Sequence, residues 1–95
     1  MYAIAIVRYR KPLEEMLKVI DEHRAYLHEL KARGILVASG PIEPRFGGAL
    51  LLRVANAAAA LLAVRDGDPF VKHDLAQYEL LPWLPNIGLD DLDRA

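Results

Sequence analysis

The chain is predicted to fold as an α+β domain of the ferredoxin-like type, with element order β-α-β-β-α-β and a four-stranded antiparallel sheet carrying two helices on one face. Residues 2–9 are apolar at nearly every position, which is typical of a central strand. Residues 13–30 carry apolar side chains at spacings of three and four, which indicates an amphipathic helix. The other elements come from short apolar runs at 35–38, 49–55 and 76–81, and from an alanine-rich run at 57–64.

The first helix is expected to run without a break between Pro12 and Gly34. Proline suits the start of a helix, and glycine readily adopts the left-handed conformation that ends one. Acidic residues follow Pro12 and basic residues precede Gly34, which complements the helix dipole. One face of this helix should be buried, and His23 lies on it; its apolar members are Leu13, Met16, Leu17, Ile20, Leu27 and Leu30.

The second and third strands are expected to form a hairpin. The Gly40-Pro41 pair should end the strand at 35–38, because this pair is a strong turn former. Gly47-Gly48 should then turn the chain into the strand at 49–55, since its spacing matches no phosphate-binding loop.

The second half of the chain is expected to repeat the helix-strand pattern. Asn56 is a good N-cap for a helix over 57–64. Asp68-Pro69 then resembles the start of a further helical turn, with Asp68 as N-cap and Pro69 at the first helical position. After the last strand, residues 86–95 are expected to form an acidic tail, so that residues 1–95 make a single domain.

His23 and Asp68 are the candidate acid/base pair of this chain, which contains no cysteine. Imidazole exchanges protons near neutral pH, and a carboxylate on its other nitrogen would hold its orientation. Both residues also have a structural interpretation, His23 as a hydrogen-bonded core residue and Asp68 as a helix cap. The residues by themselves leave both interpretations open.

No metal or other cofactor is predicted. His23 and His28 are five positions apart, about 140° around a helix, so they cannot share a ligand site. His28 also lacks the second histidine of a zinc-binding helix, and His73 stands among charged residues as a surface residue would.

Several motifs resemble those of the YCII-related (YciI-like) family in order and spacing, across residues 2–83. These motifs are His23-Arg24-Ala25-Tyr26-Leu27, Gly34-Ile35-Leu36-Val37-Ala38-Ser39-Gly40-Pro41, Gly47-Gly48-Ala49-Leu50-Leu51-Leu52, Asp68-Pro69-Phe70 and Pro82-Trp83. The resemblance implies a dimeric α/β barrel like that of muconolactone isomerases, with His23 and Asp68 as a His-Asp dyad in a pocket. It also implies substrate-binding roles for Ser39, Gly40, Phe70 and Trp83; for Phe70 and Trp83, plain core packing is the alternative.

Two positions depart from the pattern of many relatives. Ile20 stands where they have an arginine, and Asp74 stands where they have a glycine. Loss of that arginine would remove an anion anchor from the pocket.

Composition narrows the range of partners. Twelve basic against thirteen acidic residues give no electrostatic footprint for nucleic acid or for a membrane surface. With 54% hydrophobic residues and only 95 positions, a second copy of the chain would help to bury the apolar strands, so we expect a homodimer. Met1 leads directly into an apolar strand without the features of a signal peptide, so we expect a cytoplasmic location.

Two functions follow from these observations. The first is an enzyme that moves a proton on a small molecule, as an isomerase, lyase or dehydrohalogenase does. The second is a non-catalytic dimeric module that binds a small ligand or another protein. A His23–Asp68 pair that opens on a cavity would favour the first, whereas a sealed pair would favour the second.

Overall fold

The computed structural model of the protein, which describes residues 1–55 and 57–95, confirms the predicted fold class. A four-stranded antiparallel sheet has the strand order β2-β3-β1-β4. Its strands are β1 (Tyr2–Tyr9), β2 (Leu36–Pro41), β3 (Gly47–Arg53) and β4 (Ala76–Trp83). The helices are α1 (Leu13–Leu17), α2 (Ile20–Ala32), α3 (Ala57–Gly67), α4 (Pro69–Lys72) and α5 (Leu89–Arg94).

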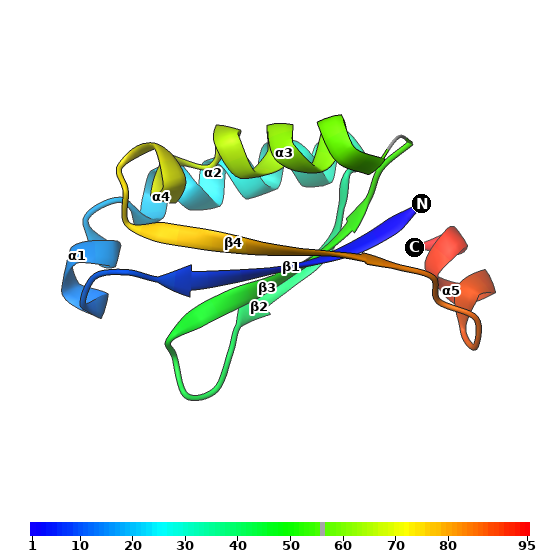
Figure 1. Cartoon of the computed structure of the whole chain (residues 1–95), viewed down its shortest axis with the longest axis horizontal. Coiled ribbons are helices and arrows are strands. Elements are labelled where there is room, and N and C mark those ends of the chain that lie inside the picture. The colour runs from blue at the N-terminus through cyan, green and yellow to red at the C-terminus, as the bar shows by residue number, and fades with distance from the viewer. Residues whose placement is uncertain (56) are drawn as a thin grey trace.

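The helices α2, α3 and α4 cover one face of the sheet, and α1 and α5 lie at its two ends (Figure 1). β1 pairs with both β3 and β4, as expected for a central strand. Its residues Ala3, Ala5 and Val7 are buried beneath the helices, and small side chains here let α2 and α3 approach the sheet. The core consequently lies between the sheet and these two helices.

The helix predicted between Pro12 and Gly34 is interrupted, so the prediction of one continuous helix is wrong. The backbone N–H groups of Lys18 and Val19 donate to residues three positions earlier, which is the tighter 3₁₀ pattern, and a new helix starts at Ile20. The break changes which side chains face inward. Met16 and Leu30 are buried, whereas Leu13 and Leu17 of the predicted apolar face are exposed. The predicted end is right, because Gly34 has a φ of 77°.

Strand β2 continues through Gly40 and Pro41, where the sequence predicted its end. β2 is an edge strand, so the missing N–H of Pro41 removes no hydrogen bond from the sheet. A register shift between Leu36 and Ala38 inserts one extra residue, as a β-bulge does. Beyond the bulge Ser39 pairs with the buried Leu50, and the shift therefore turns Ser39 toward the side of the sheet that carries the helices.

Gly47 and Gly48 lie within β3 and not in the hairpin turn, which corrects the prediction for this pair. A Cβ atom at Gly47 would lie 1.9 Å from the carbonyl oxygen of Val7, and one at Gly48 would lie 3.1 Å from that of Gly40. These glycines allow close approach between strands. The expected N-cap Asn56 lies outside the described residues.

The C-terminal segment is docked on the domain, although the sequence predicted only an acidic tail. The Tyr2 hydroxyl donates to Asp93 Oδ1 at 2.6 Å, across almost the whole length of the chain. Arg53 lies over the Tyr2 ring and donates to the carbonyl oxygen of Leu92. These contacts hold α5 against the end of the sheet opposite α1.

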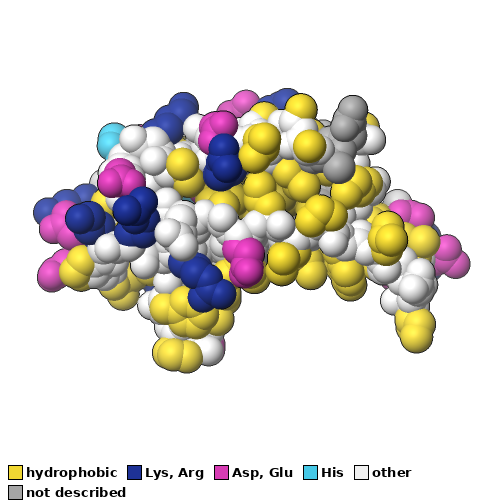
Figure 2. Space-filling model, in the orientation of Figure 1, with side chains coloured by type: hydrophobic (Ala, Val, Ile, Leu, Met, Phe, Trp, Pro, Cys, Tyr) yellow, Lys and Arg dark blue, Asp and Glu magenta, His cyan; other side chains and the backbone are white. Residues whose placement is uncertain are grey.

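The sheet face opposite the helices is largely apolar. Its side chains alternate with the core residues along each strand and include Ile4, Leu51, Leu81 and Trp83. Leu81 and Trp83 remain 43% and 39% exposed. In Figure 2 hydrophobic side chains gather along the lower side of the sheet in the centre of the view. Within the described residues no helix is both long enough and apolar enough to cross a membrane.

Candidate functional site

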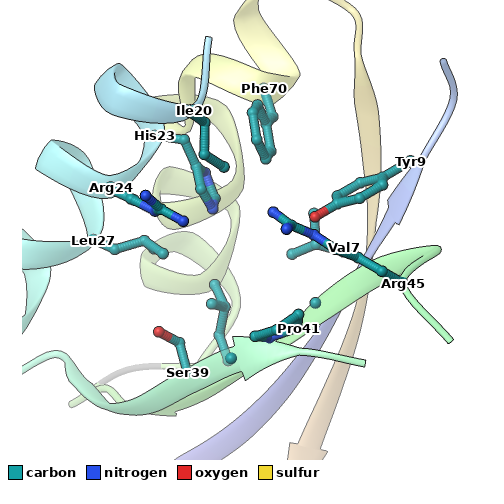
Figure 3. A pocket seen from close by; sticks show the side chains of 13 residues that line it. Val7, Tyr9, Ile20, His23, Arg24, Leu27, Ser39, Pro41, Arg45 and Phe70 are labelled. Atoms are coloured by element: carbon teal, nitrogen blue, oxygen red, sulfur yellow. The ribbon is translucent and has the colours of Figure 1, made fainter. Parts of the chain in front are cut away.

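A cavity of about 260 Å³ lies between α2 and the helix-bearing side of the sheet (Figure 3). Apolar side chains of β1, β3 and α2 form much of its wall, among them Val7, Leu27 and Leu50. The polar groups at the cavity come from His23 and Arg24 on α2, Ser39 on β2, Arg45 in the β2–β3 loop and Tyr9 at the end of β1.

His23 lines this cavity and is held from behind by Asp68. His23 Nδ1 lies 2.8 Å from Asp68 Oδ1, and the His23 side chain is only 12% exposed. A carboxylate can only accept a hydrogen bond, so the Nδ1–H of His23 donates this bond, and in the neutral imidazole the lone pair is then on Nε2. In this tautomer His23 can take a proton from a molecule in the cavity.

Asp68 is completely buried, and its two oxygens accept three hydrogen bonds. Oδ1 accepts from His23 Nδ1 and from the backbone N–H of Phe70 at 2.9 Å, while Oδ2 accepts from the Tyr78 hydroxyl. The bond from Phe70 makes Asp68 the N-cap of α4, with Pro69 at the first helical position, as predicted. The structural interpretation of Asp68 is thus correct, and its other contacts add the link to His23.

Phe70 fixes the plane of the imidazole. The Phe70 ring stacks on His23 with 3.9 Å between centroids and 8° between planes. The Tyr9 and Phe70 rings pack edge to face, with an angle of 83° between their planes and 6.0 Å between their centroids. One face of the imidazole is therefore covered by an aromatic ring, which limits how far the imidazole can tilt toward that side.

Tyr78 is a third member of the network that the sequence analysis missed. Burial raises the pKa of Tyr78 strongly, and the charge of Asp68 raises it further. Burial and Asp68 also raise the pKa of Tyr26, whose hydroxyl donates to the carbonyl oxygen of Val64 at 2.8 Å. Both tyrosines thus stay protonated. The alternation Ala76, Tyr78, Leu80 along the predicted last strand could have indicated that Tyr78 faces the helices.

Arg24 and Arg45 are the other site residues that sequence reasoning missed. Figure 3 shows their guanidinium groups pointing toward His23 from opposite sides of the cavity. Ile20 also lines the cavity. Arg24 lies four positions after Ile20 and three before Leu27, on the helix face that lines the cavity, and this spacing could have indicated it. Arg45 is brought in by the hairpin.

The predicted substrate-binding residues separate into two groups. Ser39, Gly40 and Phe70 line the His23 cavity. Trp83 does not line it, because it pairs with Tyr2 and borders a depression on the opposite face of the sheet. His73 lies on the surface, with Nε2 3.6 Å from Glu22 Oε2. In the part of the chain that the structure describes, no three His, Asp or Glu side chains are grouped as metal ligands.

Comparison with known proteins identifies the family of this chain and a solved structure with a similar fold. The YCII-related domain model matches residues 1–84. No protein of curated function matches the chain by sequence. The chain is similar to the structure of 5-chloro-2-hydroxyhydroquinone dehydrochlorinase (TftG) from Burkholderia phenoliruptrix in complex with 2,5-dihydroxybenzoquinone, with a TM-score of 0.78 and 21% identity. The alignment covers 90% of this chain and 96% of the other, and supports the ferredoxin-like fold.

Proposed function

Since this chain belongs to the YCII-related family, we propose that it is a small-molecule enzyme in which His23, held by Asp68, transfers a proton. The observation that carries this proposal is the 2.8 Å bond between His23 Nδ1 and Asp68 Oδ1 behind an imidazole that opens on a cavity. A pair within hydrogen-bond distance and open to a cavity supports the enzyme over a non-catalytic binding module.

The proposed reaction begins with proton abstraction. His23 Nε2 takes a proton from an acidic C–H or O–H group of the substrate, and the electron pair of that bond stays on the substrate. The pair then either expels a leaving group from a neighbouring carbon or takes up a proton at another carbon from the imidazolium. The first course is an elimination and the second an isomerisation. Asp68 stabilises the imidazolium through Nδ1–H, and in an elimination His23 finally releases its proton to water.

The cavity suits a substrate with a single ring. An engineered cavity of about 150 Å³ holds benzene, and this one is larger at about 260 Å³. Phe70 and Leu50 offer apolar walls, and Ser39 and Gly40 offer polar contacts at the β2 side. The structural neighbour was solved with a one-ring quinone, which is in keeping with this class of ligand.

We propose that the protein acts as a homodimer that buries the open sheet face. A monomer would leave Ile4, Leu51, Leu81 and Trp83 in contact with water. A second copy placed on the same face by a twofold axis would cover them and would form the α/β barrel. In this proposal Trp83 belongs to the interface between the two copies and does not bind substrate.

The test is a proton-transfer assay with a matched histidine control. Wild-type protein, His23→Gln and His73→Gln are incubated with 5-chloro-2-hydroxyhydroquinone, and chloride and quinone formation are followed. The same proteins are then incubated in D2O with one-ring enols and unsaturated lactones, and proton exchange is followed by NMR. We expect turnover or exchange by wild type and His73→Gln, and a loss of about 100-fold or more in His23→Gln.

Two results would contradict the proposal. Equal rates in wild type and His23→Gln would show that His23 is not the base. Binding of ring compounds with no turnover or exchange of any of them would instead favour the non-catalytic module.

A further inference from the structure

Two arginines that line the cavity beside His23, Arg24 and Arg45, are exposed to solvent and have no carboxylate partner among the described residues. Among the described residues no carboxylate lies within 4.0 Å of Arg24 or Arg45. The other arginines all have acceptors. Arg8, Arg10, Arg33, Arg65 and Arg94 each contact a carboxylate, and Arg53 donates to backbone carbonyls.

We propose that Arg24 and Arg45 form an anion subsite, and that the ligand of this cavity carries a planar oxyanion, a carboxylate or an enolate, held between them. The proposal deepens the proposed function, since it names the substrate class of the same cavity. Binding of an anion can nevertheless be measured without any turnover.

The two arginines come from different elements and line the same cavity. Arg24 lies on α2 next to His23, and Arg45 lies in the loop between β2 and β3. Both guanidinium groups point into the cavity toward His23 (Figure 3). An anion bound between these two positive charges would be attracted by both of them.

A planar oxyanion fits the hydrogen-bond donors of this cavity. The guanidinium group presents parallel N–H donors that match the two oxygens of a carboxylate or the coplanar oxygens of an enolised ring. The aromatic face of Phe70 and the aliphatic side chains of Leu27 and Leu50 would contact the rest of the molecule. Such an anion would lie next to His23, where the proton is transferred.

The experiment compares anions with neutral molecules of the same shape. Benzoate is paired with benzamide, and 2,5-dihydroxybenzoquinone with 2,5-dimethoxybenzoquinone. Their dissociation constants are measured by NMR titration at low and high salt. The proteins are wild type, Arg24→Gln, Arg45→Gln, Arg45→Lys and the control Arg33→Gln, whose arginine pairs with Glu29 on the surface.

We expect wild type and Arg33→Gln to bind at least one anion more tightly than its neutral partner, and more tightly at low salt. Arg24→Gln and Arg45→Gln should each raise the dissociation constant of that anion by roughly 10-fold or more, as expected for the loss of a hydrogen bond to a charged group. Arg45→Lys should keep only part of the affinity, since lysine lacks the parallel N–H donors of the guanidinium group. Preference for benzoate identifies a carboxylate, and preference for the dihydroxyquinone identifies an enolate.

The outcomes separate this inference from the proposed function. Neutral partners that bind as tightly as the anions, or glutamine variants that bind anions as wild type does, would overturn the anion subsite even if His23 proves catalytic. Anion binding that depends on Arg24 and Arg45, in a protein that turns over nothing, would keep the subsite and overturn the catalytic proposal.

Discussion

The Phe70 ring lies parallel to the imidazole of His23, 3.9 Å away, and the backbone N–H of Phe70 donates to the same Asp68 oxygen as His23 Nδ1. One carboxylate thus begins helix α4 and holds His23. Because α4 places Phe70 on the imidazole, the helix cap and the orientation of the ring depend on each other. The structural and the catalytic interpretations of Asp68 describe the same set of bonds.

Removing Asp68 should destabilise the fold much more than removing His23. In Asp68→Ala the buried Tyr78 hydroxyl and His23 Nδ1 lose their acceptor and α4 loses its cap, so we expect a cost of about 3–5 kcal/mol. In His23→Ala the carboxylate keeps two of its three donors, and we expect about 1–3 kcal/mol. Urea unfolding of both variants measures the difference, and equal costs would mean that the carboxylate is not the centre of the network.

Tyr78 should make the protein less stable at high pH. Its pKa is raised in the folded state by burial and by Asp68. Above about pH 10 the unfolded chain loses this proton while the folded chain keeps it, so the unfolded state binds fewer protons and the free energy of unfolding falls. The slope for this group is up to about 1.4 kcal/mol per pH unit. Below the ordinary tyrosine pKa the contribution is fully present.

Tyr78→Phe tests that slope. At neutral pH the variant should be less stable than wild type by about 1–3 kcal/mol, since Asp68 loses a donor. Above about pH 10 the difference should shrink, because the phenylalanine cannot titrate. Unfolding curves measured at a series of pH values follow both trends. Parallel wild-type and variant curves at high pH would contradict the assignment.

The central strand and the start of α4 could be predicted because each depends on local chemistry. An apolar run such as residues 2–9 has few alternatives to a buried strand, and Asp68-Pro69 is a strong cap for a helix. The pairing of Asp68 with His23 was implied only by the family resemblance. The residues around each of the two give no local signal that points to the other. The pair is a contact across 45 positions.

The missed features all depend on tertiary contacts. Tyr78 reaches Asp68 through the register of β4 against β1, and Arg45 reaches the cavity through the path of the β2–β3 loop. The docking of α5 depends on a bond between Tyr2 and Asp93, at opposite ends of the chain. Composition marks residues 86–95 as acidic but does not indicate where they bind.

Gly47→Ala should be costly, and Gly40→Ala should not. A methyl group at Gly47 would overlap the carbonyl oxygen of Val7 in the neighbouring strand, whereas nothing lies within 4 Å of one at Gly40. We expect a loss of about 1–3 kcal/mol for Gly47→Ala, which is the range for overpacking, and a change within about 0.5 kcal/mol for Gly40→Ala. Thermal unfolding of the two variants makes the comparison. Similar melting temperatures would show that β1 and β3 can separate locally.

Asp74 should be replaceable by glycine with a gain in stability. Its φ of 57° lies in the left-handed region, and its carboxylate pairs with Arg10 at 2.9 Å on the surface. Asp74→Gly removes backbone strain of about 1 kcal/mol and loses an exposed ion pair worth less than that. Asp74→Ala loses the ion pair and keeps the strain. We expect the free energy of unfolding in urea to be about 1 kcal/mol higher for Asp74→Gly than for Asp74→Ala. The reverse order would show that the backbone here is unstrained.

The homodimer can be tested with two leucines of nearly equal exposure. Leu81 lies on the open sheet face and is 43% exposed, while Leu62 lies on α3 and is 42% exposed. We expect light scattering coupled to size exclusion to give twice the chain mass of 10.6 kDa for wild type and Leu62→Glu. Leu81→Glu should give a monomer, because a buried carboxylate without a partner costs several kcal/mol. A monomeric wild type would contradict the homodimer, whereas a dimer that survives Leu81→Glu and breaks in Leu62→Glu would assign the interface elsewhere. In the second case the helices, and not the sheet, would form the contact between the two copies.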